Sequence, residues 1–253
     1  MRALLPAICL MIVPAALPAQ PPGKFPPDSL VNTQVIPLST PVIQVVGMMR
    51  NFAGDLGVRC QYCHVGEEGM PLGKFDFAKD EKRTKLVARQ MMRMLEEINR
   101  RVDTLPGHEE HAHEAAAPMV TCGTCHRGVS RPIPLFTLMT DAATSGGADS
   151  AVRAYRALRE RYYGRAAYDF GEASLNIAAF RLGRAGKFEE ALALLNLNES
   201  FFPASSGLSV FRGNVLLMRG DTTGAAGAFR EALRRDTTNV EARGRLRDIG
   251  QRP

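Results

Sequence analysis

The amino-acid sequence predicts a mainly α-helical protein built in two parts. The first part contains the pentad Cys-x-x-Cys-His twice, and each copy follows a segment in which apolar residues recur at helical spacing. The second part repeats itself at an interval of 34 residues, a period typical of stacked helix pairs. A chain of 253 residues is long enough for two small domains, each with its own core.

The N-terminal segment has the layout of a secretory signal. One arginine precedes an apolar run, small residues follow it, and we expect residues 1–19 to be removed on export to the periplasm. The apolar run is short for a membrane span, although an uncleaved anchor is the alternative. Cys9 lies inside this segment, so the expected mature chain keeps only the four cysteines of the two pentads. None is left over for a disulfide framework.

The charge balance does not indicate a nucleic-acid partner. The formal net charge is +6, and the excess arginines are scattered along expected helices instead of forming a patch. We therefore expect these arginines to form a solvated helical surface.

The first domain, expected over residues 20–139, should alternate helix and pentad. Its Pro-rich start is expected to be extended, with at most a short strand around residues 33–36. The triplet Ser-Thr-Pro at residues 39–41 is a helix start signal, and Gly57 can adopt the left-handed conformation that ends that helix. A second helix is expected over residues 82–101. Its apolar stripe consists of Val87, Met91, Met94, Leu95, Ile98 and Val102.

Each pentad is expected to bind a haem covalently. Cys-x-x-Cys-His is the attachment signature of c-type haem: two thiols three residues apart reach the two vinyl groups of one porphyrin. The adjacent imidazole is thereby held beneath the iron, so His64 and His126 are the expected ligands of two irons. The attachment residues are Cys60, Cys63, Cys122 and Cys125.

Three other uses of the four cysteines agree with part of the pattern. Paired Cys-x-x-Cys half-sites can build a tetrathiolate zinc site, and one such pair can be a redox-active dithiol. Two disulfides are the third alternative. Only haem attachment requires a histidine directly after both pairs, and we therefore prefer haem.

The sixth iron ligand distinguishes an electron carrier from an enzyme. A methionine thioether raises the reduction potential and closes the iron to substrates, whereas an open position permits peroxide chemistry. Met49, on the apolar face of the first helix, and Met91, in the second, are the candidates. Met48 and Met92 each point about 100° away from their neighbour. Met94 shares the stripe with Met91, and periodicity does not choose between them.

The second domain is expected over residues 151–253, after a small-residue linker over residues 140–150. Its period, with glycine at a turn and alanine where two helices touch, resembles tetratricopeptide repeats. Flanking helices over residues 151–163 and 241–249 are expected to cap the repeats. The positions that correspond are Leu182 with Leu216, Gly186 with Gly220, and Ala191 with Ala225.

Three segments of the first domain resemble a known family. "MRNFAGDLGVRCQYCHV", "ARQMMRMLEEIN" and "VTCGTCHRGVSRPIP" are similar to one half of the cytochrome c subunit of photosynthetic reaction centres, over about residues 32–136. That subunit has four haems in two similar halves, each with a helix, a turn and Cys-x-x-Cys-His arranged twice. The resemblance implies two haems here, with Met49 opposite His64 and Met91 opposite His126.

The chain departs from this family in two respects. Only one half is present, and the helical repeats have no counterpart in the photosynthetic subunit. In the family, a histidine in the loop before the second pentad of the first half ligates a haem of the other half. Here that loop carries His108, His111 and His113, which could do the same across a homodimer or bind a metal, although a solvated loop is the main expectation.

The sequence therefore predicts an exported, periplasmic dihaem c-type cytochrome that passes single electrons between redox proteins without turning over a substrate. The helical repeats would dock a redox partner or hold the cytochrome near a membrane complex, since stacked helix pairs offer a concave surface. The alternatives are a dihaem peroxidase-like enzyme with one open iron, and a helical scaffold whose haems are accessory.

Overall fold

The computed structural model describes residues 23–106 and 119–252 of the chain. The chain forms two compact units, residues 1–130 and residues 131–253, which we call the first and second unit. The described residues are mainly helical, as the sequence predicts, and their β-structure is limited to an isolated bridge between Val65 and Asp76. Within the described ranges, no helix is both long enough and apolar enough to cross a bilayer.

The first unit alternates helix and pentad as expected. Its elements are α1 (Val42–Leu56), η1 (Cys60–Tyr62), η2 (Leu72–Lys74), α2 (Arg83–Val102) and α3 (Cys122–His126). Gly57 ends α1 in the left-handed conformation, with φ of 64°. The start signal predicts Pro41 as the first helical residue, but Pro41 is the N-cap, and the helix begins one residue later, at Val42. No side chain caps the helix. Residues 34–36 form bends, and residues 33–36 form no strand.

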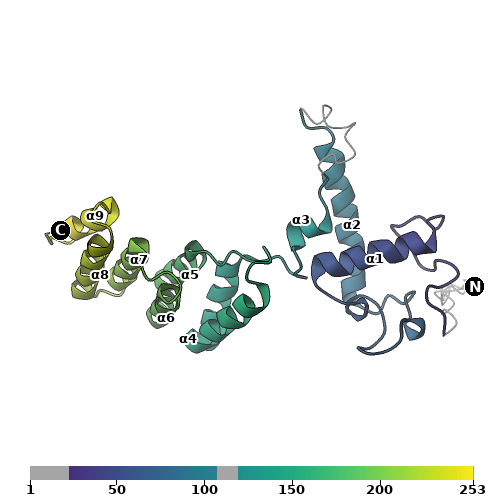
Figure 1. Ribbon diagram of the computed structural model, residues 1–253, viewed down its shortest axis with the longest axis horizontal. Coiled ribbons are helices and arrows are strands. Elements are labelled where there is room, and N and C mark those ends of the chain that lie inside the picture. Colours follow the sequence, from purple (N-terminus) through teal and green to yellow (C-terminus); the bar gives the residue numbers. More distant parts are fainter. Residues whose placement is uncertain (1–22, 107–118, 253) are drawn as a thin grey trace, which may run out of the picture. The chain divides into compact units, whose positions relative to one another are not determined.

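The second unit consists of successive helices that the predicted period describes closely (Figure 1). They are α4 (Leu135–Tyr162), α5 (Glu172–Arg184), α6 (Phe188–Glu199), α7 (Ser206–Met218), α8 (Thr222–Arg235) and α9 (Val240–Asp248). The helices α5, α7 and α9 begin at residues 172, 206 and 240, and α6 and α8 begin at 188 and 222. Each interval is 34 residues. Gly186 and Gly220, at the turns between paired helices, have φ of 75° and 86°.

Residues 140–150, for which the sequence suggests a linker, lie inside α4. The helix bends at Gly147, where φ is 75° and ψ is −177°, and continues to Tyr162. Ala143 and Ala151, on either side of the bend, are fully buried. The small residues of this stretch therefore allow close helix packing, and the boundary between the units lies earlier, after Ser130.

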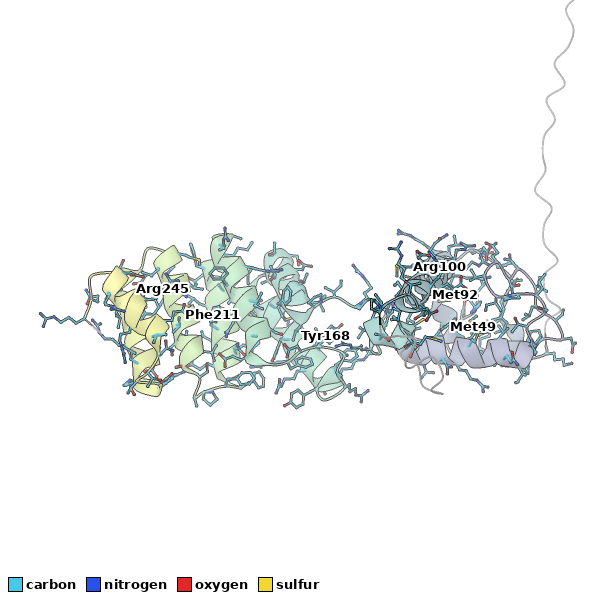
Figure 2. The ribbon with its side chains drawn as sticks, turned by 90° about the horizontal axis from the view of Figure 1, so that it is seen from above. Met49, Met92, Arg100, Tyr168, Phe211 and Arg245 are labelled. Atoms are coloured by element: carbon cyan, nitrogen blue, oxygen red, sulfur yellow. The ribbon has the colours of Figure 1, made fainter. Side chains whose placement is uncertain are left out.

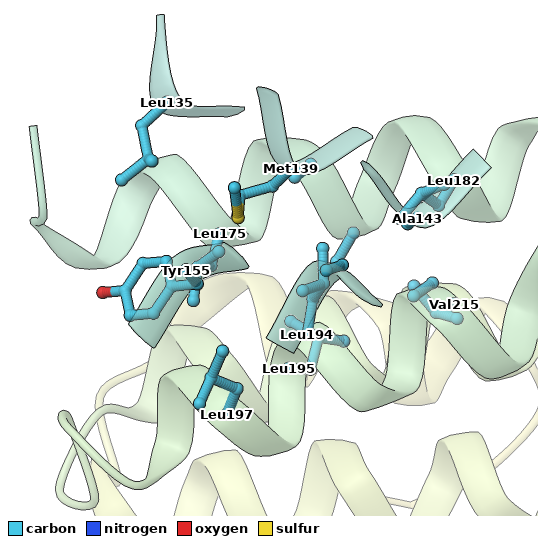
Figure 3. Close-up of a cluster of buried hydrophobic side chains, with 14 of the residues drawn as sticks. Leu135, Met139, Ala143, Tyr155, Leu175, Leu182, Leu194, Leu195, Leu197 and Val215 are labelled. Carbon is cyan, nitrogen blue, oxygen red and sulfur yellow. The ribbon is translucent and has the colours of Figure 1, made fainter. Parts of the chain in front are cut away.

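The apolar core of the described residues lies mostly in the second unit. One cluster joins α4 to α7, and Figure 3 shows its members around Met139, Tyr155 and Leu194. A second cluster joins α7, α8 and α9 around Phe229. In the first unit the buried apolar side chains among the described residues are Val45, Val46, Phe75, Ala78 and Val129. Because burial of apolar surface is the main stabilising term in folding, the first unit has little core of its own.

Candidate haem sites

The first pentad lies in a tight turn directly after α1. The backbone N–H groups of Cys63 and His64 both donate to the carbonyl of Cys60, at 3.2 and 2.9 Å. Cys60 and Cys63 are half-buried free thiols. The turn therefore keeps both thiols and the imidazole together, as attachment to one porphyrin requires.

His64 is held in its neutral form by its surroundings. Its ring meets the ring of Phe77 edge-on, with centroids 4.9 Å apart. The pKa of His64 is lowered to about 4, mainly by burial and next by the positive charge of Lys85. A neutral imidazole is the form that ligates iron. Its Nδ1 is buried without a hydrogen-bond partner in the described part of the chain.

An ionic network with two buried cations supports the loop that carries Phe77. The ammonium group of Lys85 donates to the carbonyls of Phe77, Ala78 and Lys79 at 2.9, 2.9 and 2.8 Å. The same group pairs with Asp80 at 2.9 Å. These contacts satisfy an ammonium group whose residue is only 8% exposed.

Arg89, one helical turn beyond Lys85, completes this network. Its guanidinium pairs with Asp80 at 2.8 Å and donates to the carbonyl of Asn32 at 2.9 Å. The hydrogen bond from Arg89 is the main reason that the pKa of Asp80 lies far below its usual value. The Asn32 amide in turn donates to the carbonyl of Ala78 at 2.6 Å. The network thus fixes the N-terminal segment and the loop against α2.

The second pentad forms the short helix α3. Thr121 and Thr124 cap its start reciprocally: each side-chain oxygen accepts from the other residue's backbone N–H, at 3.3 and 3.0 Å. Nδ1 of His126 lies 2.9 Å from the carbonyl of Val129. Since a carbonyl only accepts, Nδ1 carries the proton and Nε2 keeps its lone pair for a metal. Cys122 is a half-buried free thiol and Cys125 an exposed one.

The two pentads are joined through both long helices. The N–H of Gly128 donates to the carbonyl of Asp55 in the last turn of α1, at 2.8 Å. At the end of α2, the Asn99 side chain donates to the carbonyl of Val120 and accepts from its N–H, both at 2.8 Å. Folding of the unit therefore fixes how one pentad lies relative to the other.

Comparison with known families agrees with this geometry. The family model of the photosynthetic reaction centre cytochrome C subunit matches residues 44–167, which include both pentads. Over these residues the chain is therefore similar to that family. No curated protein matches the chain. We call the matched part the cytochrome region, and the match extends beyond the expected residue 136 into α4.

The cytochrome region exposes an apolar stripe on α2. Val87, Met91 and Met94 are 44%, 43% and 51% exposed, although their spacing predicts a buried face. Met49 of α1 is half-buried. Met92 instead lines a groove with Phe52 and Leu95. Figure 2 labels Met49 and Met92 in the first unit. Uncovered apolar stripes of this kind are unusual on an isolated domain, and a haem beside α2 would cover this one. The choice of Met49 and Met91 as ligands stays a prediction.

The remaining uses of the cysteines find less support in the cytochrome region. All four pentad thiols are free. A tetrathiolate zinc site requires the two pairs to converge, yet among the described residues no group of three or more His, Cys, Asp or Glu side chains is placed to hold an ion. The free thiols, the neutral buried His64 and the uncovered stripe of α2 fit haem. His108, His111 and His113 lie outside the described residues.

Sequence reasoning missed the buried network of Asp80, Lys85 and Arg89. Lys85 and Arg89 are one helical turn apart on α2, on the side that the apolar stripe leaves polar. This four-residue spacing is the only local signal for the network. It does not identify the buried cations, because exposed residues such as Arg93 lie at the same spacing. No local sequence pattern indicated that Asn32 bonds Arg89 and Ala78.

Proposed function

We propose that the chain is an exported dihaem c-type cytochrome that relays single electrons between redox partner proteins. One observation carries this proposal: both Cys-x-x-Cys-His pentads are intact and carry free thiols in a unit with little apolar core. Bound haem supplies one-electron chemistry through its iron. The family match supports a c-type cytochrome. The number of haems and the export follow from the two pentads and from the signal-like residues 1–19, which lie outside the described residues.

The residues of the chain have separate tasks in this role. Cys60 and Cys63 anchor one haem and Cys122 and Cys125 the other, so that neither is lost on reduction. His64 is kept neutral by burial, and His126 is oriented by the carbonyl of Val129. In the proposed arrangement Met49 and Met91 close the sixth positions against substrates, which favours electron transfer over peroxide chemistry.

The second unit is proposed to bind a redox partner or a membrane-bound electron-transfer complex. Its support is the strict 34-residue spacing of α5, α7 and α9, which resembles tetratricopeptide repeats. Stacked repeats expose long concave surfaces suited to protein ligands. A homodimer, in which the loop histidines of one chain reach the other, remains a separate proposal.

Haem content is the direct test of this function. The full chain is produced in a host that matures c-type cytochromes, and its mass and haem absorbance are measured. We expect two haems per chain. Replacing both cysteines of one pentad by alanine (C60A with C63A, or C122A with C125A) should remove one haem in each case. A mature protein whose mass equals that of its amino acids alone would contradict the proposal.

A further inference from the structure

We propose that one exposed face of α4, after its bend at Gly147, binds a carboxylate-rich surface of a partner protein. This inference rests on the partner-binding role proposed above for the second unit, and it names the surface and the chemistry of the partner. We call this face the arginine stripe and define it by Arg153, Arg156, Arg159 and Tyr163. All four residues belong to the second unit.

The arginine stripe follows from the spacing of its residues. Positions three or four residues apart share one side of a helix, so Arg153, Arg156, Arg159 and Tyr163 follow each other along α4. Arg153 and Arg156 are exposed, and Tyr163, which ends the helix, is 63% exposed. Another side of the same helix is buried in the apolar core through Tyr155. The core therefore fixes which side of α4 faces solvent.

The positive charge of the stripe is not neutralised within the described part of the second unit. The ion pairs described there lie between Lys187 and Arg245 along the chain, and none involves an arginine of α4. Residues 151–165 contain five arginines and one acidic residue, Glu160. Surfaces that bind each other have complementary charge, so this stripe favours a partner rich in carboxylates.

The guanidinium of Arg159 is held in place by aromatic rings. Its central carbon lies 4.0 Å from the ring centroid of Tyr163 and 4.2 Å from that of Phe201. Its Nη1 also donates to the hydroxyl of Tyr155 at 3.4 Å. The ring faces attract a cation without cancelling its charge. Arg159 is therefore ordered before a partner binds, which reduces the side-chain entropy lost on binding.

The backbone and rings beside Tyr163 are also ordered. The N–H of Tyr163 donates to the carbonyl of Arg159 at 2.9 Å, and the N–H of Arg165 donates to that of Tyr162 at 3.0 Å. The rings of Tyr162 and Tyr168 meet edge-on, with centroids 5.3 Å apart (Figure 2 labels Tyr168). Tyrosine and arginine are the residues that often contribute most of the binding energy at protein–protein interfaces. An ordered surface of both types therefore fits a protein partner.

A lipid surface fits the stripe less well than a protein does. A helix that lies on a membrane buries its apolar face among the lipids, whereas the apolar side of α4, with Met139 and Ala143, is packed in the core. Tyr163 is the one aromatic residue of the stripe. The planar guanidinium of arginine matches a carboxylate with two parallel hydrogen bonds, so aspartate and glutamate side chains are the expected contacts.

The test measures binding of the full-length holoprotein to fluorescently labelled poly-L-glutamate by fluorescence anisotropy. We expect binding that weakens as salt is added. Arg153→Gln combined with Arg156→Gln should weaken it about tenfold, because two ion pairs are lost. Arg247→Gln combined with Arg252→Gln is the matched control. It removes the same charge from exposed arginines in and after α9, and it should change binding by less than about twofold.

Tyr163 supplies an independent test of the ordered guanidinium. Tyr163→Ala removes one ring from Arg159 and should weaken binding of the polymer, whereas Tyr163→Phe keeps the ring and should leave binding unchanged. Equal weakening by the two double arginine variants, or no binding by the unaltered protein, would overturn the inference.

Vesicles of phosphatidylglycerol and phosphatidylcholine distinguish a lipid partner. Binding to them that is tighter than binding to the polymer, and that is lost in the variant with both Arg153→Gln and Arg156→Gln, would assign the stripe to a membrane and overturn the inference. A protein without bound haem would instead overturn the proposed function. The core of the second unit contains no pentad residue, so the polymer assay still decides the inference on that protein.

Discussion

At the scale of single residues, the contact between Gly57 and Gly128 shows how the first unit holds its two pentads together. Gly57 ends α1 with φ of 64°, a conformation that other residues seldom adopt. A Cβ at this position would overlap the carbonyl oxygen of Gly128. This carbonyl belongs to backbone just after the second pentad, so no side-chain rotation can relieve the overlap. Glycine at position 57 therefore serves both the helix end and the approach of the pentads.

This contact predicts a large difference between two glycines of α1. Gly57→Ala should destabilise the haem-bound protein by more than the ~1–2 kcal/mol of a left-handed alanine, because the overlap adds to that cost. Gly54→Ala is the matched control: its Cβ would meet no atom within 4 Å, and alanine is favoured over glycine in a helix by about 1 kcal/mol. Urea unfolding monitored at the haem absorbance measures both. Equal stability of the two variants would show that the contact is not needed.

At the scale of elements, the helix α2 has three roles. Its first turns bond the first pentad, its buried cations hold the loop that carries Phe77, and its end bonds the second pentad through Asn99. Its stripe of Val87, Met91 and Met94 remains exposed in the polypeptide. The apolar stripe of an amphipathic helix normally packs against the rest of the protein, and here the proposed haem would cover the stripe.

The resemblance to the reaction-centre cytochrome family predicts which methionine closes which iron, Met49 opposite His64 and Met91 opposite His126. If thioethers fill both sixth positions as proposed, the ferrous holoprotein should not bind carbon monoxide. Met49→Ala and Met91→Ala should each open one site and bind one carbon monoxide per chain, detected by absorbance. Met94→Ala removes a more exposed methionine of the same stripe and should bind none. Stoichiometric binding by the unaltered protein would favour the peroxidase-like alternative instead.

At the scale of the whole molecule, the two units differ in what stabilises them. The second unit has two continuous apolar clusters, and its helices contact their successors along the 34-residue repeat. The described part of the first unit has few buried apolar residues, and its buried Lys85 and Arg89 pair with Asp80. Its stability should therefore depend on the covalently bound groups.

This difference predicts that loss of haem affects one unit only. In the full chain produced without haem attachment, amide protection in α1 and α2 should fall strongly, while protection in α5 to α8 should not change. Hydrogen exchange of the proteins with and without haem measures both units in one sample, so the second unit is the internal control. Unchanged protection of α1 and α2 would show that the first unit is stable without haem.

Much of the helical plan was predictable from local sequence. Apolar spacing and the glycine signal located α1 and α2 to within a residue, and the predicted 34-residue period recurs in the starts of α5 to α9. The stretch at residues 140–150 was misread as a linker because Gly, Ser and Thr are typical of loops. Its helicity depends on the burial of Ala143 and Ala151, which is a tertiary effect.

The sequence by itself determined the chemistry: two thiol pairs, each followed by a histidine, and the helices that precede them. Such motifs are local, so their meaning does not depend on the rest of the fold. Only the tertiary structure decided that Lys85 and Arg89 are buried, and that Met91 is exposed. Burial depends on which distant backbone covers a side chain. Here the carbonyls of residues 77–79 and of Asn32 reach α2 across the fold, and no local pattern encodes that contact.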